Sequence, residues 1–125
     1  MDEATDFAAF LGIATKAGDG AVMIPGTTAL GRPGVLHGGA IATLLEQAGR
    51  AVVAAAVDRP GGGTPAIQLA SMTVDYLRVG PMAEVRAAGT IVKLGARVAV
   101  VGTTAWADDP GKPFAAAKLT FLLIR

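Results

Sequence analysis

Leu36-His37-Gly38-Gly39-Ala40-Ile41-Ala42-Thr43-Leu44-Leu45-Glu46-Gln47-Ala48 is the stretch that decides the fold, because two glycines open a long apolar run that contains one carboxylate. The run from Ala40 to Val57 is apolar on nearly every side, which is typical of a helix buried inside a fold. At 1.5 Å per residue such a helix is about 27 Å long, enough to cross a small domain. Glu46 lies in the middle of this predicted helix, where carboxylates are rarely buried without a partner or a function. We therefore take Glu46 as the first candidate functional residue.

The composition predicts one domain that associates with copies of itself. A chain of 125 residues is of ordinary domain size, so we expect residues 1–125 to form a single domain with one core. Hydrophobic residues make up 52% of the chain and charged residues only 17%, which is more apolar surface than a lone domain of this size usually covers. We therefore expect a homo-oligomer.

Charge and cysteine content argue against several classes of protein. A formal net charge of +1 gives no basic face for nucleic acid. The absence of cysteine excludes disulfides and thiolate chemistry and fits a cytoplasmic protein. The acidic start over residues 1–6 is unlike a signal peptide. The apolar run contains Glu46, Gln47 and Arg50, so we expect no membrane span.

The rest of the chain predicts a small helix followed by strands. Apolar residues at helical spacing predict an N-terminal packing helix over Asp6–Lys16, within residues 1–17, which ends at Gly18-Asp19-Gly20. Ala21–Ile24 has the pattern of a short strand, and the Gly- and Pro-rich segment Asp58–Pro65 predicts an irregular connector. Four longer strand-like runs follow: 66–77, 83–94, 97–106 and 114–124.

The links between these four runs are short, which predicts antiparallel neighbours in a meander. In the last run, alternate residues from Ala115 to Leu123 share an apolar face that we expect to be buried. Both faces of run 97–106 are fairly apolar, as in a central strand. The predicted fold class is α+β, with a long antiparallel curved sheet wrapped around one central helix.

Two motifs resemble those of a known family. His37-Gly38-Gly39 is followed nine residues after the histidine by Glu46, and Thr73-Val74-Asp75-Tyr76-Leu77-Arg78 precedes three further strands. This combination resembles the hotdog-fold acyl-CoA thioesterases, in particular the PaaI-like (phenylacetate-degradation) branch, from about Gly20 to the C-terminus. The resemblance implies a homodimer, commonly a dimer of dimers, whose subunits pair their sheets edge to edge and whose active sites lie at the dimer interface.

Elementary chemistry gives the motif residues their expected roles. A thioester carbonyl becomes an oxyanion when attacked, and the free N–H groups at a helix N-terminus are fixed donors for that charge. By resemblance Gly38 supplies the polarising N–H, and Gly39, which has no side chain, lets the substrate approach the backbone. Glu46 lies about two turns further along the helix, so we expect it to serve the Gly38 site of the partner chain. The sequence leaves open whether Glu46 acts as a general base or as a nucleophile.

Each of these assignments has a structural alternative. Glu46 could instead form an ion pair with Arg50, one turn away. His37 stands alone without metal-ligand companions, and we expect it to support the loop or orient the substrate. Gln68 is a polar interruption of the first long strand and is our candidate for positioning the water, although an outward-facing strand residue explains it equally well.

The phosphates of CoA require cationic side chains near the mouth of the site. The expected set is Arg78 together with Lys93 and Arg97, which bracket Gly95-Ala96, and Arg32 is a further candidate. Charges at hairpin ends also keep sheet edges soluble, which is the alternative for all of them. The chain departs from the family in two places: no Asn or Gln lies in the loop before His37, and Arg50 occupies a position where some relatives place a small hydroxyl.

The sequence therefore predicts an acyl-CoA thioesterase that hydrolyses an acyl- or aroyl-CoA to free acid and CoA, without a metal or redox cofactor. One alternative is a hotdog module that binds acyl-CoA without turning it over. Another is a hotdog dehydratase or hydratase, which pairs a histidine with an acid across a different loop.

Overall fold

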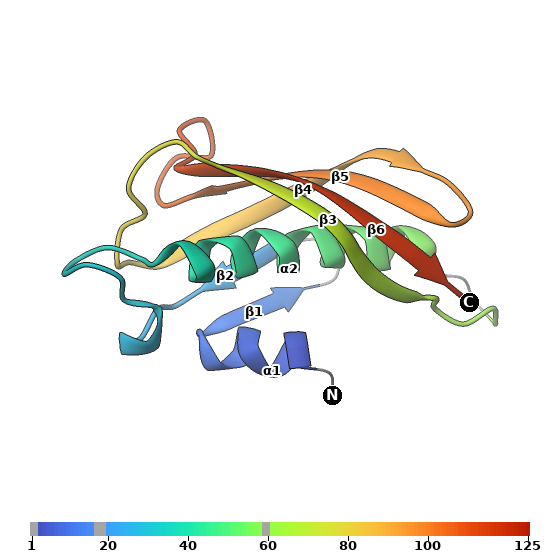
Figure 1. Ribbon diagram of the computed structural model, residues 1–125, viewed down its shortest axis with the longest axis horizontal. Helices are drawn as coiled ribbons and strands as arrows, with labels where there is room; N and C mark the ends of the chain where they lie inside the picture. Colours follow the sequence, from blue (N-terminus) through green and yellow to red (C-terminus); the bar gives the residue numbers. More distant parts are fainter. Residues whose placement is uncertain (1–2, 17–19, 59–60) are drawn as a thin grey trace.

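One long helix lies in the concave side of a curled antiparallel sheet (Figure 1). The computed structural model describes residues 3–16, 20–58 and 61–125. Its elements in chain order are α1 (Glu3–Phe10), β1 (Ile13–Lys16), β2 (Gly20–Met23), the 3₁₀ helix η1 (Thr27–Ala29), α2 (Gly38–Val57), β3 (Ala66–Tyr76), β4 (Val85–Leu94), β5 (Val98–Trp106) and β6 (Ala115–Ile124). The α+β architecture predicted from the sequence is confirmed.

The order of strands in the sheet is β1-β2-β4-β5-β6-β3, and each neighbouring pair is antiparallel. β5 is central, and the alternate residues of β6 from Ala115 to Leu123 are buried, both as predicted. The prediction that all four long strands form one meander is wrong, because β3 pairs with β6 and not with β4. Residues 77–84 instead carry the chain across the sheet, and the amides of Leu77 and Arg78 both donate to the carbonyl of Phe114 on the way.

The N-terminal segment is a helix followed by a strand, and not the helix over Asp6–Lys16 that the sequence predicted. α1 ends at Phe10 because Gly12 adopts a positive φ of 82°, a conformation that favours glycine. The carbonyl of Gly12 then accepts from the amide of Ile24 at 3.0 Å, and β1 begins at Ile13. Phe7 and Phe10 are exposed and stack on each other. The predicted stop at residues 18–20 falls largely outside the described residues.

α2 is the core helix that the apolar pattern predicted. Its buried side packs against β2, β4 and β5, so the one described helix with the length and hydropathy of a membrane span serves as the core of this fold. Glycines allow the close approach of helix and sheet: a Cβ at Gly89 of β4 would lie 3.0 Å from Val52 of α2, and one at Gly49 would lie 3.3 Å from the Phe121 ring.

Thr103 of β5 faces this core, is only 2% exposed, and its hydroxyl has no hydrogen-bond partner among the described residues. Burying an unpaired hydroxyl is unfavourable. We expect Thr103→Val, which replaces the hydroxyl with a methyl group, to raise the free energy of unfolding by about 1 kcal/mol in urea titrations. Thr104→Val is the matched control: its hydroxyl is exposed on the other face of the strand, so its stability should stay close to wild type. A less stable Thr103→Val protein contradicts the prediction.

Candidate active site

The N-terminus of α2 is held in place by His37. This residue is the N-cap of the helix, and its Nδ1 accepts the amide of Ala40 at 2.9 Å. Because Nδ1 accepts, the ring proton lies on Nε2, which donates to the carbonyl of Thr28 at 3.1 Å. The Thr28 hydroxyl in turn donates to the carbonyl of Phe10 at the end of α1. Both ring nitrogens are therefore engaged in supporting the loop, while a role for His37 in orienting the substrate stays a prediction.

The first two amides of α2 have no acceptor among the described residues. The amides of Ala40 and Ile41 donate to the carbonyl of His37, but those of Gly38 and Gly39 meet no acceptor within the described part of the chain. Both glycines are exposed. A helix N-terminus with unpaired N–H groups and the positive end of the helix dipole attracts a developing negative charge.

A cavity of about 320 Å³ lies at this end of α2. It brings together four residues that the sequence singled out: His37, Gly38, Arg78 and the further candidate Arg32. The other residues that line it are Gly31, Val35, Leu36, Ile41, Tyr76, Val79 and Gly80. The free amide of Gly38 thus shares a small cavity with two cationic residues.

Tyr76 is a residue of this cavity that the sequence analysis missed. It ends β3 and donates its hydroxyl to the carbonyl of Gly38 at 2.9 Å. The available signal was that Tyr76, the chain's one tyrosine, lies inside the second motif. Its contact with Gly38 joins residues 38 positions apart, and no local pattern predicts such a contact.

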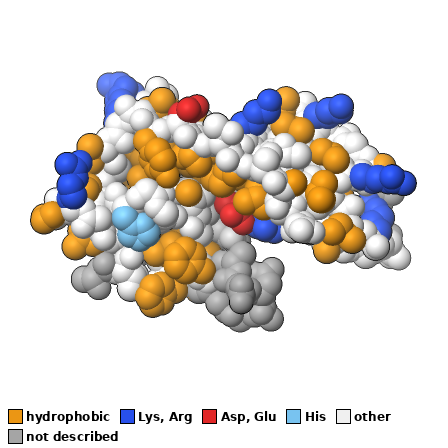
Figure 2. Space-filling view, in the orientation of Figure 1, with side chains coloured by type: hydrophobic (Ala, Val, Ile, Leu, Met, Phe, Trp, Pro, Cys, Tyr) orange, Lys and Arg blue, Asp and Glu red, His pale blue; other side chains and the backbone are white. Residues whose placement is uncertain are grey.

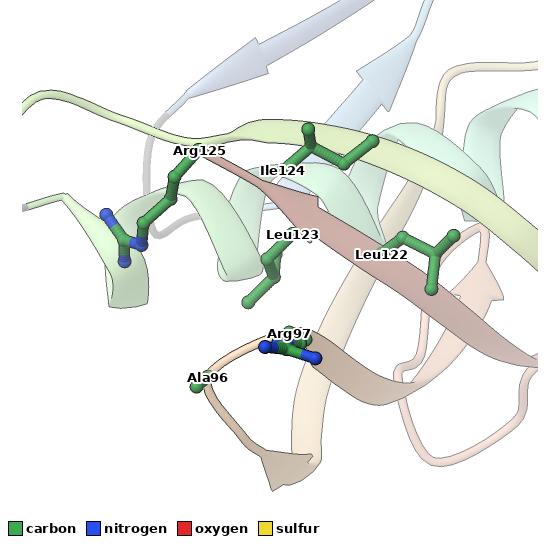
Figure 3. Close-up of a pocket in the computed structure, with 6 residues that line it drawn as sticks. All are labelled: Ala96, Arg97, Leu122, Leu123, Ile124 and Arg125. Carbon is green, nitrogen blue, oxygen red and sulfur yellow. The ribbon is translucent and has the colours of Figure 1, made fainter.

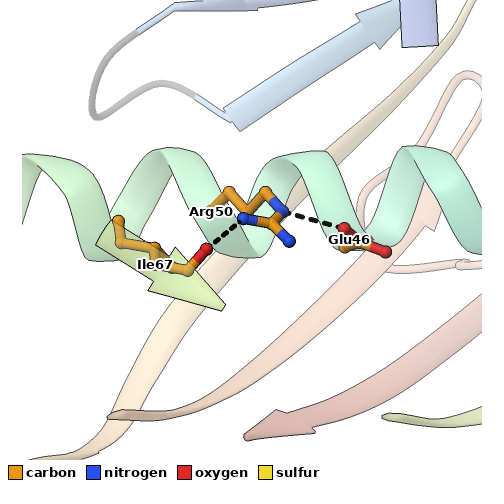
Figure 4. A network of polar contacts seen from close by, with 3 residues as sticks. All are labelled: Glu46, Arg50 and Ile67. Carbon is orange, nitrogen blue, oxygen red and sulfur yellow. Dashed lines mark hydrogen bonds and ion pairs between the residues drawn. The ribbon is translucent and has the colours of Figure 1, made fainter. Parts of the chain in front are cut away.

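Glu46 forms an ion pair within its own chain (Figure 4). Its Oε2 accepts from Nε of Arg50 at 2.8 Å, and Nη1 of Arg50 donates to the carbonyl of Ile67 in β3 at 2.6 Å. The Arg50 guanidinium also lies over the Phe121 ring, 5.4 Å from its centroid. The Glu46 side chain is 20% exposed. The ion pair that the sequence left open is therefore present.

Glu46 does not line the cavity at Gly38. It lies eight residues further along α2, which is about two helical turns. The two predicted reacting groups of one chain are therefore separate, and a reaction that uses both requires them to come from different chains.

Gln68 lies apart from both groups. Its neighbours in β3, Ile67 and Leu69, pack against the core, whereas Gln68 is exposed and sits opposite Leu122 of β6. Because strand side chains alternate, Gln68 points away from α2. Its predicted role in positioning water finds no support within one chain.

The predicted phosphate-binding hairpin lies at the far end of α2. Gly95 lines a cavity with Ala56 and Val57, the last residues of the helix, whereas Gly38 begins that helix, roughly 30 Å away. Lys93 is the last residue but one of β4. Arg97 lines a larger cavity of about 530 Å³ with Arg125 and residues 122–124 of β6 (Figure 3). The structure therefore places Arg78 at the candidate site and separates Lys93, Gly95 and Arg97 from it within one chain.

A family model described as Thioesterase superfamily matches residues 33–114. Among curated proteins no match was found. Solved structures similar to the chain include a mutant thioesterase from Pseudomonas aeruginosa, which is 27% identical with a TM-score of 0.78, over 94% of this chain and 85% of that one. 

Two further structures are less similar in sequence. A Bacillus halodurans protein crystallised with CoA is 24% identical with a TM-score of 0.78, over 100% of this chain and 82% of that one. A phenylacetic acid degradation-related protein from Ralstonia eutropha is 20% identical with a TM-score of 0.76, over 94% and 89% of the two chains. Since the family model covers more than half of the chain, and since these structures share its curled sheet and central helix, the protein belongs to the thioesterase superfamily and has the hotdog fold.

Proposed function

We propose that the protein is an acyl-CoA thioesterase of the PaaI-like branch, which hydrolyses an acyl- or aroyl-CoA to the free acid and CoA. One observation carries this proposal: the free amides of Gly38 and Gly39 open α2 at a cavity that also holds Arg32 and Arg78. Membership of the thioesterase superfamily and the CoA bound to the Bacillus halodurans protein support it.

In the proposed reaction the substrate carbonyl lies against the Gly38 amide, which stabilises the oxyanion as it forms. Glu46 of the other chain either takes a proton from water, so that hydroxide adds to the carbonyl, or attacks the carbonyl itself. In the first route the tetrahedral intermediate expels the CoA thiolate, which takes up the proton. In the second route the thiolate leaves an acyl anhydride on Glu46, and water then hydrolyses it to the acid.

The proposed assembly is a homodimer, in a dimer of dimers. β3 is the longer of the two edge strands of the sheet, and its second edge has no partner strand among the described residues. A long free edge is a ready template for pairing with another chain. Hydrophobic side chains also gather across the middle of the face in Figure 2, while Lys and Arg lie mostly along its margins. Both features favour association.

The assembly also gives the distant cations a role. Arg32 and Arg78 lie at the cavity of their own chain, where a guanidinium pairs well with phosphate. Lys93, Gly95 and Arg97 lie at the far end of α2, so they serve CoA only at a site completed by another chain. We propose a cytoplasmic location and no metal or redox cofactor for this reaction.

A non-catalytic acyl-CoA-binding module is the second candidate function. The ion pair between Glu46 and Arg50 favours it, because a carboxylate held by an arginine has less freedom to attack or to take a proton. Ligand binding without turnover is the outcome that separates this function from the thioesterase.

Free-thiol release from a panel of short, medium, aromatic and hydroxylated acyl-CoAs tests the proposed function. We expect at least one ester to be hydrolysed at a rate that is proportional to enzyme concentration. Thermal unfolding with the same esters and with CoA serves as the binding control, since a ligand that binds the folded state raises Tm. A Tm that rises with no thiol released from any ester supports the binding module and contradicts the thioesterase.

A further inference from the structure

Tyr76 is fixed at the point where β3 meets the N-terminus of α2. It pairs with Ala115 of β6, and the amides of the next two residues both donate to the carbonyl of Phe114, at 2.8 and 3.0 Å. From this position its hydroxyl donates to the carbonyl of Gly38 at 2.9 Å. A Cβ on Gly38 would lie 3.2 Å from the same hydroxyl oxygen. The tyrosine is thus packed directly on the first residue of α2.

The carbonyl that Tyr76 contacts belongs to the same planar peptide unit as the amide of Gly39. This peptide joins the first two residues of α2, and glycines flank it, so no side chain of its own restrains its plane at the open end of the helix. A hydrogen bond to its carbonyl adds a restraint on the plane, and it also polarises the peptide so that its N–H becomes a better donor. The N–H in question is the free amide of Gly39.

We propose that Tyr76 is a positioning residue that orients and polarises the Gly38–Gly39 peptide, so that the amide of Gly39 acts as a second donor to the oxyanion beside the amide of Gly38. This proposal rests on the proposed thioesterase function and adds a residue to it. Tyr76 acts through the peptide and takes no proton from the substrate.

The next peptide of α2 provides a matched comparison. The hydroxyl of Thr43 donates to the carbonyl of Gly39 at 2.8 Å, which is the same kind of contact one peptide further along. The amide of that peptide belongs to Ala40, and it is already bonded to Nδ1 of His37. Loss of the Thr43 hydroxyl therefore changes an amide that is unavailable to substrate.

The experiment compares Tyr76→Phe with Thr43→Val. Tyr76 is 54% exposed, and phenylalanine keeps its ring, so both variants should melt close to wild type. We expect Tyr76→Phe to lower kcat about tenfold with KM changed less than twofold, because the lost donor acts on the transition state. Thr43→Val should stay within twofold of wild type in both constants.

A spectroscopic measurement reports on the peptide without relying on turnover. In proton–nitrogen correlation spectra, the Gly39 amide proton should move upfield in Tyr76→Phe and should move less in Thr43→Val. The proposal is overturned by an unshifted Gly39 amide in Tyr76→Phe, by a kcat within twofold of wild type, or by an equal loss in Thr43→Val. If the wild-type protein releases no thiol, the thioesterase function fails, and the Gly39 shift alone decides whether Tyr76 holds the peptide.

Discussion

The Glu46→Gln variant is expected to bind acyl-CoA as the wild type does and to lose turnover by roughly 10³-fold. An amide neither takes a proton from water nor attacks a thioester, so both routes of the proposed reaction stop. The Gln side chain has nearly the same shape. Its carbonyl oxygen can still accept from Nε of Arg50, which in the wild type lies 2.8 Å from Oε2 of Glu46. Free-thiol release and ligand-induced shifts in Tm measure the two properties separately.

Glu84→Gln is the matched control for this change. Glu84 also pairs with an arginine, Arg86, at 3.2 Å, but it is half exposed and does not line the cavity at Gly38. We expect its turnover to match that of the wild type. Loss of a charge-assisted bond should lower the stability of Glu46→Gln by only about 1 kcal/mol, so a folded protein is available for assay. Unchanged turnover in Glu46→Gln removes the carboxylate from the mechanism.

The sequence predicted the elements of this fold well because their signals are local. The core helix was expected over Ala40–Val57 and is found over Gly38–Val57, and each long strand lies within its predicted run. Strand order was harder, since the pairing of β3 with β6 joins Ala66 to Ile124, and turn residues between β3 and β4 only show that the chain changes direction. The helix predicted over Asp6–Lys16 is wrong from Gly12 onward: this residue has a positive φ, and its carbonyl accepts from the amide of Ile24, a contact that forms only in the folded chain.

The candidate site likewise has features that local sequence signals predict and features that only the folded chain creates. The position of Gly38 at the start of α2 follows from the glycine pair and the apolar run, and the contact between Glu46 and Arg50 follows from a spacing of four residues. The contacts that shape the cavity, such as Tyr76 with Gly38, join segments that meet only in the folded chain. The sequence also did not show how far Lys93, Gly95 and Arg97 lie from Gly38. Gly95 meets the C-terminal end of α2 only in the folded chain, whereas Gly38 begins that helix.

The Gly38→Pro variant is expected to fold and to lose kcat by roughly 10²- to 10³-fold relative to Gly38→Ala, because proline has no N–H to stabilise the oxyanion. Proline is favoured at the first position of a helix, and the residue before it must be extended. His37 meets this condition, with φ −76° and ψ 154°. Alanine keeps the amide and places the same Cβ near the Tyr76 hydroxyl. The ratio of the two variants therefore isolates the amide from crowding, and equal kcat values contradict a role for it.

Mixing the two inactive variants tests whether one site uses both chains. A heterodimer of Gly38→Pro and Glu46→Gln contains one site with an intact Gly38 amide facing an intact Glu46, and one site that lacks both groups. Random exchange of subunits in an equal mixture should then restore about a quarter of the wild-type activity per dimer. If the amide and the carboxylate acted within one chain, every site in the mixture would lack one of them, and no activity would return. The two helical turns between Gly38 and Glu46 make the first result the expected one.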